Sequence, residues 1–272
     1  VAAACVFDAR HARQCAHHPG RAAQHQRLEA AYRTWLAQPH AGKTATVGTQ
    51  YVVPCVVHVV WGDTTLPTIG QDSLPMAQIE SQFQVLFEDF RRVPGTRGWN
   101  DVGADTHIEF TLASLDPDGN PTTGVVYHHN PNYARLERPT EDSLMRVAYA
   151  WNPAEYLNIY IVGQHHNDTV PQPGAGLVLG YASFPGYGAD VEDGIVVRHD
   201  AVGVGGTAML GNDLGRVLTH ELGHWLALFH LHSPNCDNSD CTQDGDRVCD
   251  TPPQLVNAWQ MGERHNTCAT DV

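Results

Sequence analysis

Residues 220–230 bring together side chains that can bind a metal ion and activate water. His220 and His224 are four residues apart, so on a helix their imidazoles lie on one face, one turn apart. Glu221 stands next to the first histidine, where its carboxylate can reach a metal-bound water without being a ligand. His230 can close the site if the helix stops and the chain turns back. Three histidines and one water would form the open tetrahedron of a catalytic zinc site.

Apolar residues around the motif indicate the helix that must carry it. They fall at helical spacing and are Leu218, Leu222, Trp225, Leu226 and Phe229. We expect the helix to span residues 212–228, with Asn212 or Asp213 as its N-cap. The alternative is a solvated or core histidine cluster, because the chain has 17 histidines. A His-Glu-x-x-His pattern inside an apolar helix is much rarer by chance, which favours the zinc site.

Charge and composition exclude two classes of protein. The chain has 30 acidic and 16 basic residues and a formal net charge of −14, which argues against a nucleic-acid binder. No apolar run approaches the length that spans a bilayer, so we expect no membrane insertion. The acidic balance suits a secreted protein or a calcium binder.

Seven cysteines indicate the redox compartment; they are Cys5, Cys15, Cys55, Cys236, Cys241, Cys249 and Cys268. The last four fall in a loop-rich stretch without a C-x-x-C pair, so two disulfides are expected there rather than a structural zinc. Disulfides imply an oxidising compartment, and four cysteines permit three pairings. Cys55 falls in a predicted buried strand and is expected to be a free core thiol.

The remaining pattern alternates strands with helices. One amphipathic helix is predicted at residues 21–38 and another at residues 76–92. Strands are predicted at residues 51–61, 107–113, 157–162, 177–184 and 194–198, and His58 falls in the first of these. This order predicts an α/β layer with a mostly parallel sheet. The other histidines are expected to be solvated or hydrogen-bonded.

The motif His220-Glu-x-x-His224 with His230 resembles the metzincin clan of zinc endopeptidases. Flanking segments narrow the resemblance to the pappalysin family: Val56-Val57-His58-Val59-Val60, Gln78-Ile79-x-x-Gln82, Phe87-Glu88-Asp89-Phe90, Thr122-Thr123-Gly124, Asp193-Gly194-Ile195-Val196 and Gly245-Asp246-x-Val248-x-Asp250-Thr251-Pro252. The resemblance implies a metzincin fold, with a twisted five-stranded sheet, a backing helix and the active-site helix in an upper catalytic subdomain at residues 46–230. Residues 231–272 would form a smaller, irregular, disulfide-stapled lower subdomain.

The sequence departs from the family pattern at two places after the motif. Ala227 stands where the family usually has the glycine that ends the active-site helix in a left-handed conformation. Alanine in that turn costs on the order of 1 kcal/mol, and we still expect His230 to bind. The family's Met-turn is not found before Val272, so the lower subdomain is expected to be incomplete.

Residues 1–45 resemble a short helical pro-segment. Relatives carry an Arg-Cys element before a helix, and Arg13-Gln14-Cys15 resembles it loosely. A Cys15 thiolate on the open zinc position would keep the enzyme latent. The alternatives are a Cys5–Cys15 disulfide or a free thiol.

The resemblance also implies a calcium site, a disulfide pairing and a substrate strand. The implied calcium ligands are Asp246, Val248 (carbonyl), Asp250 and Thr251, although acidic loops are equally often only solvated. The pairing that the resemblance implies is Cys241–Cys268, which leaves Cys236–Cys249. By family analogy the substrate adds to an exposed sheet edge formed by Gly180, Tyr181, Ala182, Ser183 and Phe184.

These features predict a secreted, calcium-assisted zinc endopeptidase, in which a zinc-bound water attacks the peptide bond with Glu221 as general base. Protein or peptide substrates follow from that activity. One alternative is a catalytically inactive binding module on a zinc-peptidase scaffold. Another keeps proteolysis but takes Glu263 as the third ligand in place of His230.

Overall fold

The computed structural model describes residues 30, 34, 49–62, 74–101, 103–136, 139–163, 179–184, 191–209, 211–233, 246–248, 251–252, 254–255 and 268 of the chain. The chain divides into two compact units, Val1–Trp225 and Leu226–Val272. Within the described residues, no helix is both long enough and apolar enough to cross a membrane. The helix predicted at residues 21–38 lies outside the described part, apart from Ala30 and Thr34, which are helical.

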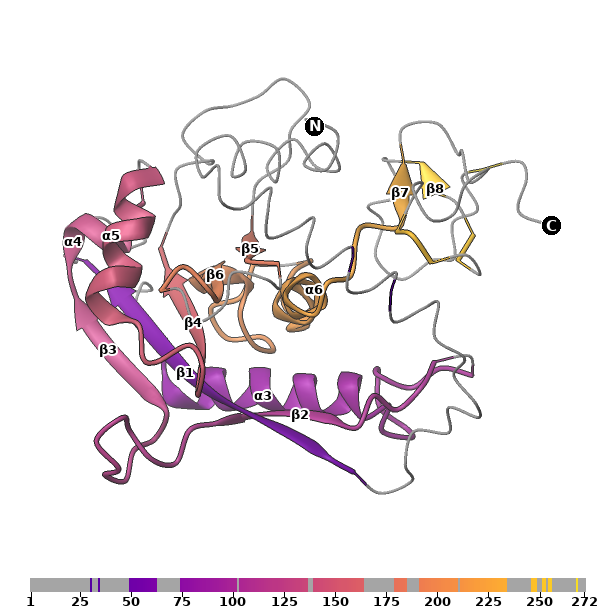
Figure 1. Ribbon diagram of the computed structural model, residues 1–272, viewed down its shortest axis with the longest axis horizontal. Helices are drawn as coiled ribbons and strands as arrows, with labels where there is room; N and C mark the ends of the chain where they lie inside the picture. Colours follow the sequence, from indigo (N-terminus) through magenta and orange to yellow (C-terminus); the bar gives the residue numbers. More distant parts are fainter. Residues whose placement is uncertain are drawn as a thin grey trace. The chain divides into compact units, whose positions relative to one another are not determined.

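A mixed sheet forms the centre of the first unit (Figure 1). Its strands are β1 (Tyr51–Trp61), β2 (Ile108–Leu112), β3 (Val125–His129), β4 (Leu157–Val162), β5 (Gly180–Ala182) and β6 (Ile195–Arg198). The strand order is β2-β1-β4-β6-β5, with β3 also paired to β1. Every pairing is parallel except that of β5 with β6. The predicted mostly parallel α/β sheet is thus confirmed.

The sheet has six strands where the sequence pattern predicts five, because no strand was predicted at the residues of β3. The eleven residues of β1 are long enough to pair with two short strands end to end. Its first half, Tyr51–Cys55, pairs with β2, and its second half, Val57–Trp61, pairs with β3. Strand β3 has only five residues and ends in two histidines, so it lacks a clear apolar run.

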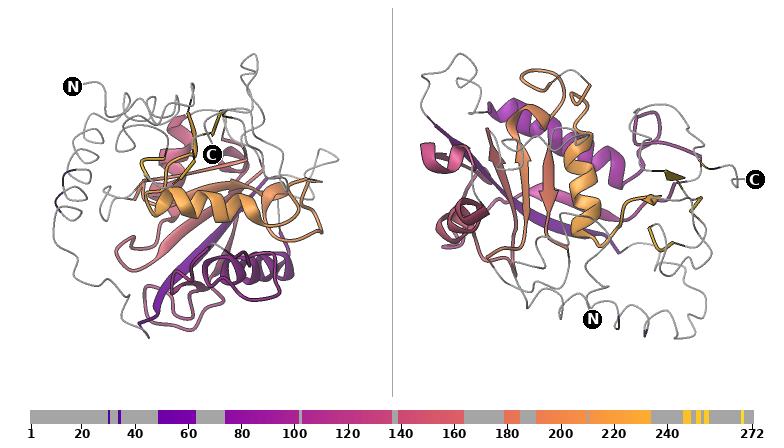
Figure 2. Two further views of the ribbon diagram at one scale, coloured as in Figure 1. Left: turned by 90° about the vertical axis from the view of Figure 1, so that its right-hand side faces the viewer. Right: turned by 90° about the horizontal axis from the view of Figure 1, so that it is seen from above.

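Helices cover both faces of this sheet (Figure 2). They are α3 (Met76–Phe90), α4 (Pro131–Ala134), α5 (Pro139–Tyr149) and α6 (Arg216–Trp225), with a 3-10 turn at His199–Ala201. Helix α5 packs through Met145 on a core cluster that includes Val60, Tyr160 and Val196. Helices α3 and α6 lie on the other face. There the ring of Phe110 contacts the ring of Phe90 on α3 and the ring of Trp225 on α6.

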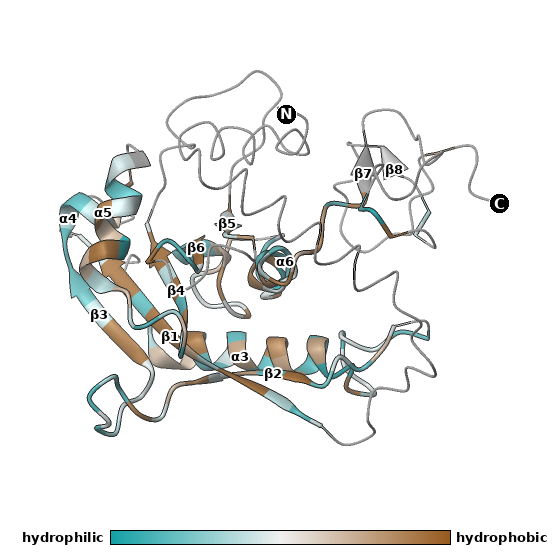
Figure 3. Ribbon diagram, in the orientation of Figure 1, coloured by the Kyte–Doolittle hydropathy of each residue, from teal (hydrophilic) through white to brown (hydrophobic). Residues whose placement is uncertain are grey.

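Hydrophobic burial explains why β1 is central. Residues 55–60 of β1 are all buried, five of these six are apolar, and Figure 3 shows mostly hydrophobic colour along the strand. A strand buried on both faces needs a continuous apolar run rather than an alternating one. The Cys55 side chain lies in this run as a free buried thiol, as predicted.

A pair of histidines lies in the core beneath α5. His58 is fully buried, with Nδ1 3.2 Å from His128 Nε2 and Nε2 3.0 Å from Asn158 Oδ1. Its ring stacks on Tyr160 at 4.9 Å, and the ring of His128 stacks on Tyr149 at 3.8 Å. Burial lowers the pKa of His58 to about 4 and also lowers the pKa of His128. These two histidines are structural, as the sequence pattern predicts.

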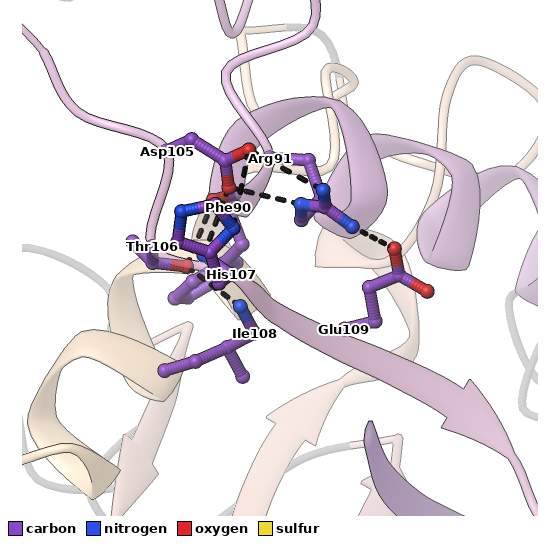
Figure 4. A network of polar contacts seen from close by, with 7 residues as sticks. All are labelled: Phe90, Arg91, Asp105, Thr106, His107, Ile108 and Glu109. Atoms are coloured by element: carbon purple, nitrogen blue, oxygen red, sulfur yellow. Dashed lines mark hydrogen bonds and ion pairs between the residues drawn. The ribbon is translucent and has the colours of Figure 1, made fainter. Parts of the chain in front are cut away.

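An ion-pair network joins the end of α3 to the start of β2 (Figure 4). Arg91 donates from Nε to Asp105 Oδ1 at 2.9 Å, and its Nη1 contacts Glu109. The hydrogen bond from Arg91 lowers the pKa of Asp105. Thr106 donates its hydroxyl to the Phe90 carbonyl at 2.8 Å. The network holds an edge strand against the backing helix.

Two short strands, β7 (His232–Ser233) and β8 (Gln254–Leu255), pair in parallel in the second unit. In the same unit, the Arg247 guanidinium lies 4.6 Å from the centre of the Phe229 ring. Cys268 is buried and disulfide-bonded. The pairing of the four late cysteines stays a prediction, since Cys236, Cys241 and Cys249 lie outside the described residues.

Candidate active site

Helix α6 carries the two histidines of the motif, as their spacing predicts. His220 Nε2 and His224 Nε2 lie 3.0 Å apart, and the two rings are nearly perpendicular, at 86°. Two nitrogens bound to one tetrahedral zinc at ~2.0 Å would lie ~3.3 Å apart. The helical repeat therefore brings both imidazoles to the separation that a shared zinc ion requires.

The chain leaves the helix in a sharp turn at Ala227, whose φ is +76°. This is the left-handed conformation that glycine usually supplies at a helix end. Alanine adopts it here, so the family's turn forms despite the substitution. Three residues later, His230 completes a group with His220 and His224 in which the ligand nitrogens all lie within 4.8 Å of one another.

The donor set of this group fits zinc. Three imidazole nitrogens are the ligands of many catalytic zinc sites, which leave one position for water or substrate. Among the described residues, the cluster comprises only histidines, and Glu221 is not one of its members. Glu263, the alternative third ligand, lies outside the described residues.

Glu221 is buried, with 6% of its surface exposed, against strand β5. A Cβ atom added to Gly180 would lie 3.0 Å from Glu221 Cγ and 3.2 Å from Glu221 Oε1. The glycine therefore leaves the space that the carboxylate side chain occupies. Of the predicted edge-strand residues, Phe184 has a ring contact with the motif, with its ring centre 5.4 Å from that of His224.

Comparisons with known proteins agree with this geometry. A peptidase family model described as pregnancy-associated plasma protein-A matches residues 140–272. Mature mirolysin of Tannerella forsythia, solved with a cleaved peptide, is 32% identical with a TM-score of 0.60, over 76% of this chain and 73% of that chain. The chain belongs to the pappalysin family.

Two further relatives extend this result. An extracellular metalloprotease of Verticillium alfalfae is 37% identical over 222 residues, which are 80% of this chain and 64% of the relative. A variant of Tannerella forsythia promirolysin is 28% identical with a TM-score of 0.63, over 89% of this chain and 73% of that chain. The chain spans about two thirds or less of the length of the curated relatives that it matches first.

The start of α6 differs from the prediction for this pappalysin. The helix begins at Arg216 rather than at residue 212, so neither Asn212 nor Asp213 is its N-cap. Asp213 instead accepts a backbone hydrogen bond from Gly205, and Gly215 adopts a φ of +71°. Tertiary hydrogen bonds outcompete the local capping signal at these residues.

Two buried glutamines of α3 hold the loop that leads into α6. Gln82 donates to the Gly215 carbonyl at 2.8 Å and accepts from the Gly203 amide at 2.8 Å. Gln78 donates to the carbonyls of Val202 at 2.9 Å and Gly205 at 2.7 Å. The pappalysin pattern Gln78-Ile79-x-x-Gln82 thus supplies hydrogen bonds to both ends of the loop that precedes α6. The spacing of the two glutamines indicates that they share one face of a helix, but it does not indicate which loop they contact.

A carboxylate of α3 fixes the first turns of α6. Thr219 donates to Asp89 Oδ2 at 2.8 Å, and Arg216 Nη1 lies 2.9 Å from Asp89 Oδ1. Burial raises the pKa of Asp89, while the hydrogen bond and the guanidinium lower it. Asp89 belongs to the family pattern Phe87-Glu88-Asp89-Phe90, and its contact with the motif helix gives that pattern a physical reason.

Other predicted site residues are only partly described. Cys15 and Asp250 lie outside the described residues. In the predicted calcium loop, Asp246 Oδ1 accepts the Val248 amide at 3.0 Å, and the Val248 carbonyl accepts the Thr251 amide at 3.1 Å. This turn places Asp246 and Val248 close together, which a calcium site would need.

Proposed function

We propose that this chain is a secreted zinc endopeptidase that hydrolyses peptide bonds in proteins. The observation that carries the proposal is the three-histidine group beside a buried Glu221 that is not a member of it. Membership of the pappalysin family supports it. Relatives that are named extracellular metalloproteases support secretion.

His220, His224 and His230 would hold the zinc ion through their ring nitrogens. When bound, zinc supplies a Lewis acid that polarises the scissile carbonyl and favours ionisation of water. His230 is proposed as the third ligand because its ligand nitrogen lies within 4.8 Å of those of the other two histidines.

Glu221 acts as the general base. Its carboxylate takes a proton from the attacking water and later gives that proton to the leaving amine. Gly180 leaves room for this side chain beside β5, because a Cβ atom at that position would lie 3.2 Å from Glu221 Oε1. No serine or cysteine nucleophile is required, because water attacks directly.

The substrate binds as an added strand on the edge formed by residues 180–184. Within the described residues, strand β5 pairs only with β6, and the ring centre of Phe184, two residues after the strand, lies 5.4 Å from that of His224. Backbone hydrogen bonds to an edge strand suit an extended peptide and require no free terminus. Mirolysin, which is similar to this chain, was solved with a cleaved peptide.

Calcium and latency are further parts of the proposal. Calcium would bind Asp246, Asp250, Thr251 and the Val248 carbonyl, because hard oxygen donors at close spacing suit that ion. Residues 1–45 would act as a pro-segment in which Cys15 closes the open zinc position. A match to a promirolysin variant over 89% of this chain supports a pro-segment.

Cleavage of a mixed peptide library, read by mass spectrometry, tests the activity. The wild type should cut, lose activity with a chelator and regain it with zinc. Glu221→Gln should retain zinc but lose at least about a hundredfold in rate, the usual contribution of a general base. His230→Ala should lose zinc affinity, whereas a Glu263 ligand would leave it intact.

The alternative is a binding module on the same scaffold. A zinc-loaded wild type that cuts no peptide, even after cleavage within residues 1–45, would refute the endopeptidase and favour that module. Zinc content measured beside activity separates the two outcomes, because the module would keep the metal.

A further inference from the structure

A single carboxylate oxygen links the proposed substrate strand to the zinc helix. Asp193 Oδ1 accepts the Trp225 indole N–H at 3.0 Å and the Ser183 hydroxyl at 2.6 Å. Ser183 follows β5 directly, and Trp225 is the last residue of α6. Asp193 itself precedes β6, so it lies on neither of the two elements that it joins.

Both partners of Asp193 lie beside groups of the proposed reaction. Trp225 is adjacent in the chain to His224, while Gly180, at the other end of β5, packs against Glu221. Ser183 is further fixed because its hydroxyl accepts the Gly194 amide at 2.8 Å. A shift of β5 relative to α6 would therefore change the space around Glu221.

Helix α5 holds the segment that carries Asp193. Arg146 is 4% exposed and donates to the Glu192 carbonyl at 2.9 Å and to Asp142 Oδ1 at 2.7 Å. Asp142 also accepts the hydroxyl of Tyr181 on β5 at 2.9 Å. The segment and the strand are thus held by the same helix, which gives Asp193 a rigid support.

We infer that Asp193 is a positioning residue that sets strand β5 against helix α6, and so aligns an extended substrate with Glu221. This inference rests on the proposed endopeptidase function. Asp193 does not touch the reacting atoms, and it acts through Ser183 and Trp225. Misplacement of a substrate by about 1 Å can cost about a hundredfold in rate, so a small loss of alignment is measurable.

The inference predicts a specific kinetic pattern. Ser183→Ala and Trp225→Phe each remove one donor to Asp193, while phenylalanine keeps a ring to pack against Phe110. Each should lower kcat by about tenfold or more, with KM changed by less than about threefold, because the edge of β5 still binds the peptide. The double variant should lose little more than either single variant, since both changes break the same link.

Three matched variants separate positioning from stability. Tyr127→Phe removes a hydroxyl that donates to the Leu74 carbonyl at 2.7 Å, on β3 and away from α6, and should leave kcat unchanged. Asp193→Asn keeps an oxygen acceptor and should retain more activity than Asp193→Ala. Zinc content should stay at the wild-type level in all of them.

Hydrogen exchange supplies a readout that needs no activity. In Asp193→Ala, the amides of residues 180–183 should exchange faster than in the wild type, and those of β4 should not. Unchanged exchange there, or rate losses that multiply independently in the double variant, would overturn the inference. An inactive wild type would instead contradict the proposed function, while the exchange result would still decide whether Asp193 fixes β5.

Discussion

The left-handed turn at Ala227 can be tested by substitution with glycine, because the backbone conformation decides whether glycine raises or lowers the stability of the protein. Ala227 has a φ of +76°, between the second and third histidines of the zinc group. An L-residue in this conformation costs about 1–2 kcal/mol relative to the right-handed region. Glycine removes that cost but adds about 0.4–1 kcal/mol of chain entropy to the unfolded state. Ala227→Gly should therefore stabilise the protein by about 0.5–1 kcal/mol.

A second alanine provides the control. Ala148 is exposed in helix α5 and is not among the residues with positive φ. Ala148→Gly should destabilise the protein by about 0.5–1 kcal/mol, because glycine in a helix costs chain entropy without relieving strain. The same chemical change is thus expected to act in opposite directions at the two sites.

Urea denaturation and calorimetry in the presence of a chelator measure both variants without the contribution of zinc. A change of about 1 kcal/mol corresponds to about 2–4 °C in Tm for a chain of this size class. Ala227→Gly should raise Tm while Ala148→Gly lowers it. A fall in Tm for Ala227→Gly similar to that of the control would refute a left-handed Ala227.

Three other outcomes are expected. Gln82→Ala should destabilise the protein by about 2–4 kcal/mol in urea denaturation, because it leaves the Gly215 carbonyl and the Gly203 amide buried without a partner. A loss of stability below about 0.5 kcal/mol, which is typical of a surface substitution, would contradict this expectation. Burial holds the pKa of His58 at about 4, against 6.5 for the unfolded chain, so the unfolded state binds the extra proton and stability falls as pH drops from about 6.5 to 4, by up to about 3 kcal/mol. The non-titrating variant His58→Gln should show a shallower pH dependence, and an equal slope would argue against the buried neutral histidine. Gly180→Ala should lower kcat by about tenfold or more with full zinc content, because the new methyl group would lie 3.2 Å from Glu221 Oε1; unchanged kcat would mean that the carboxylate has room to move.

Local periodicity predicted the placement of two of the three grouped histidines. The spacing of His220 and His224 determines their shared helix face, because the α-helical repeat depends only on neighbouring residues. The apolar run of β1 likewise predicts a buried strand, since continuous burial requires continuous apolar sequence. The sequence alone did not decide whether Ala227 keeps the family's turn, and the backbone adopts the left-handed conformation there.

The first residue of α6 was not predictable from local sequence. Asn212 and Asp213 are good capping residues, but the loop around them bonds to Gln82 and to Gly205 instead. Gln82 is far away in the chain, and the Gly205 amide bonds to the Asp213 carbonyl rather than to its side chain, so no capping rule includes these contacts. Strand β3 was missed for a similar reason, because its pairing depends on the length of β1 rather than on its own five residues.

The sequence by itself indicated which residues have the chemistry to bind zinc and act as base, because the motif is local and its chemistry is set by residue type. Only the tertiary structure showed how residues 180–184, the proposed substrate strand, lie against that motif. Gly180 against Glu221, and Asp193 between Ser183 and Trp225, join residues that are distant in the chain. Such contacts depend on how sheet and helices pack, and packing is specified by the whole chain rather than by any one segment of it.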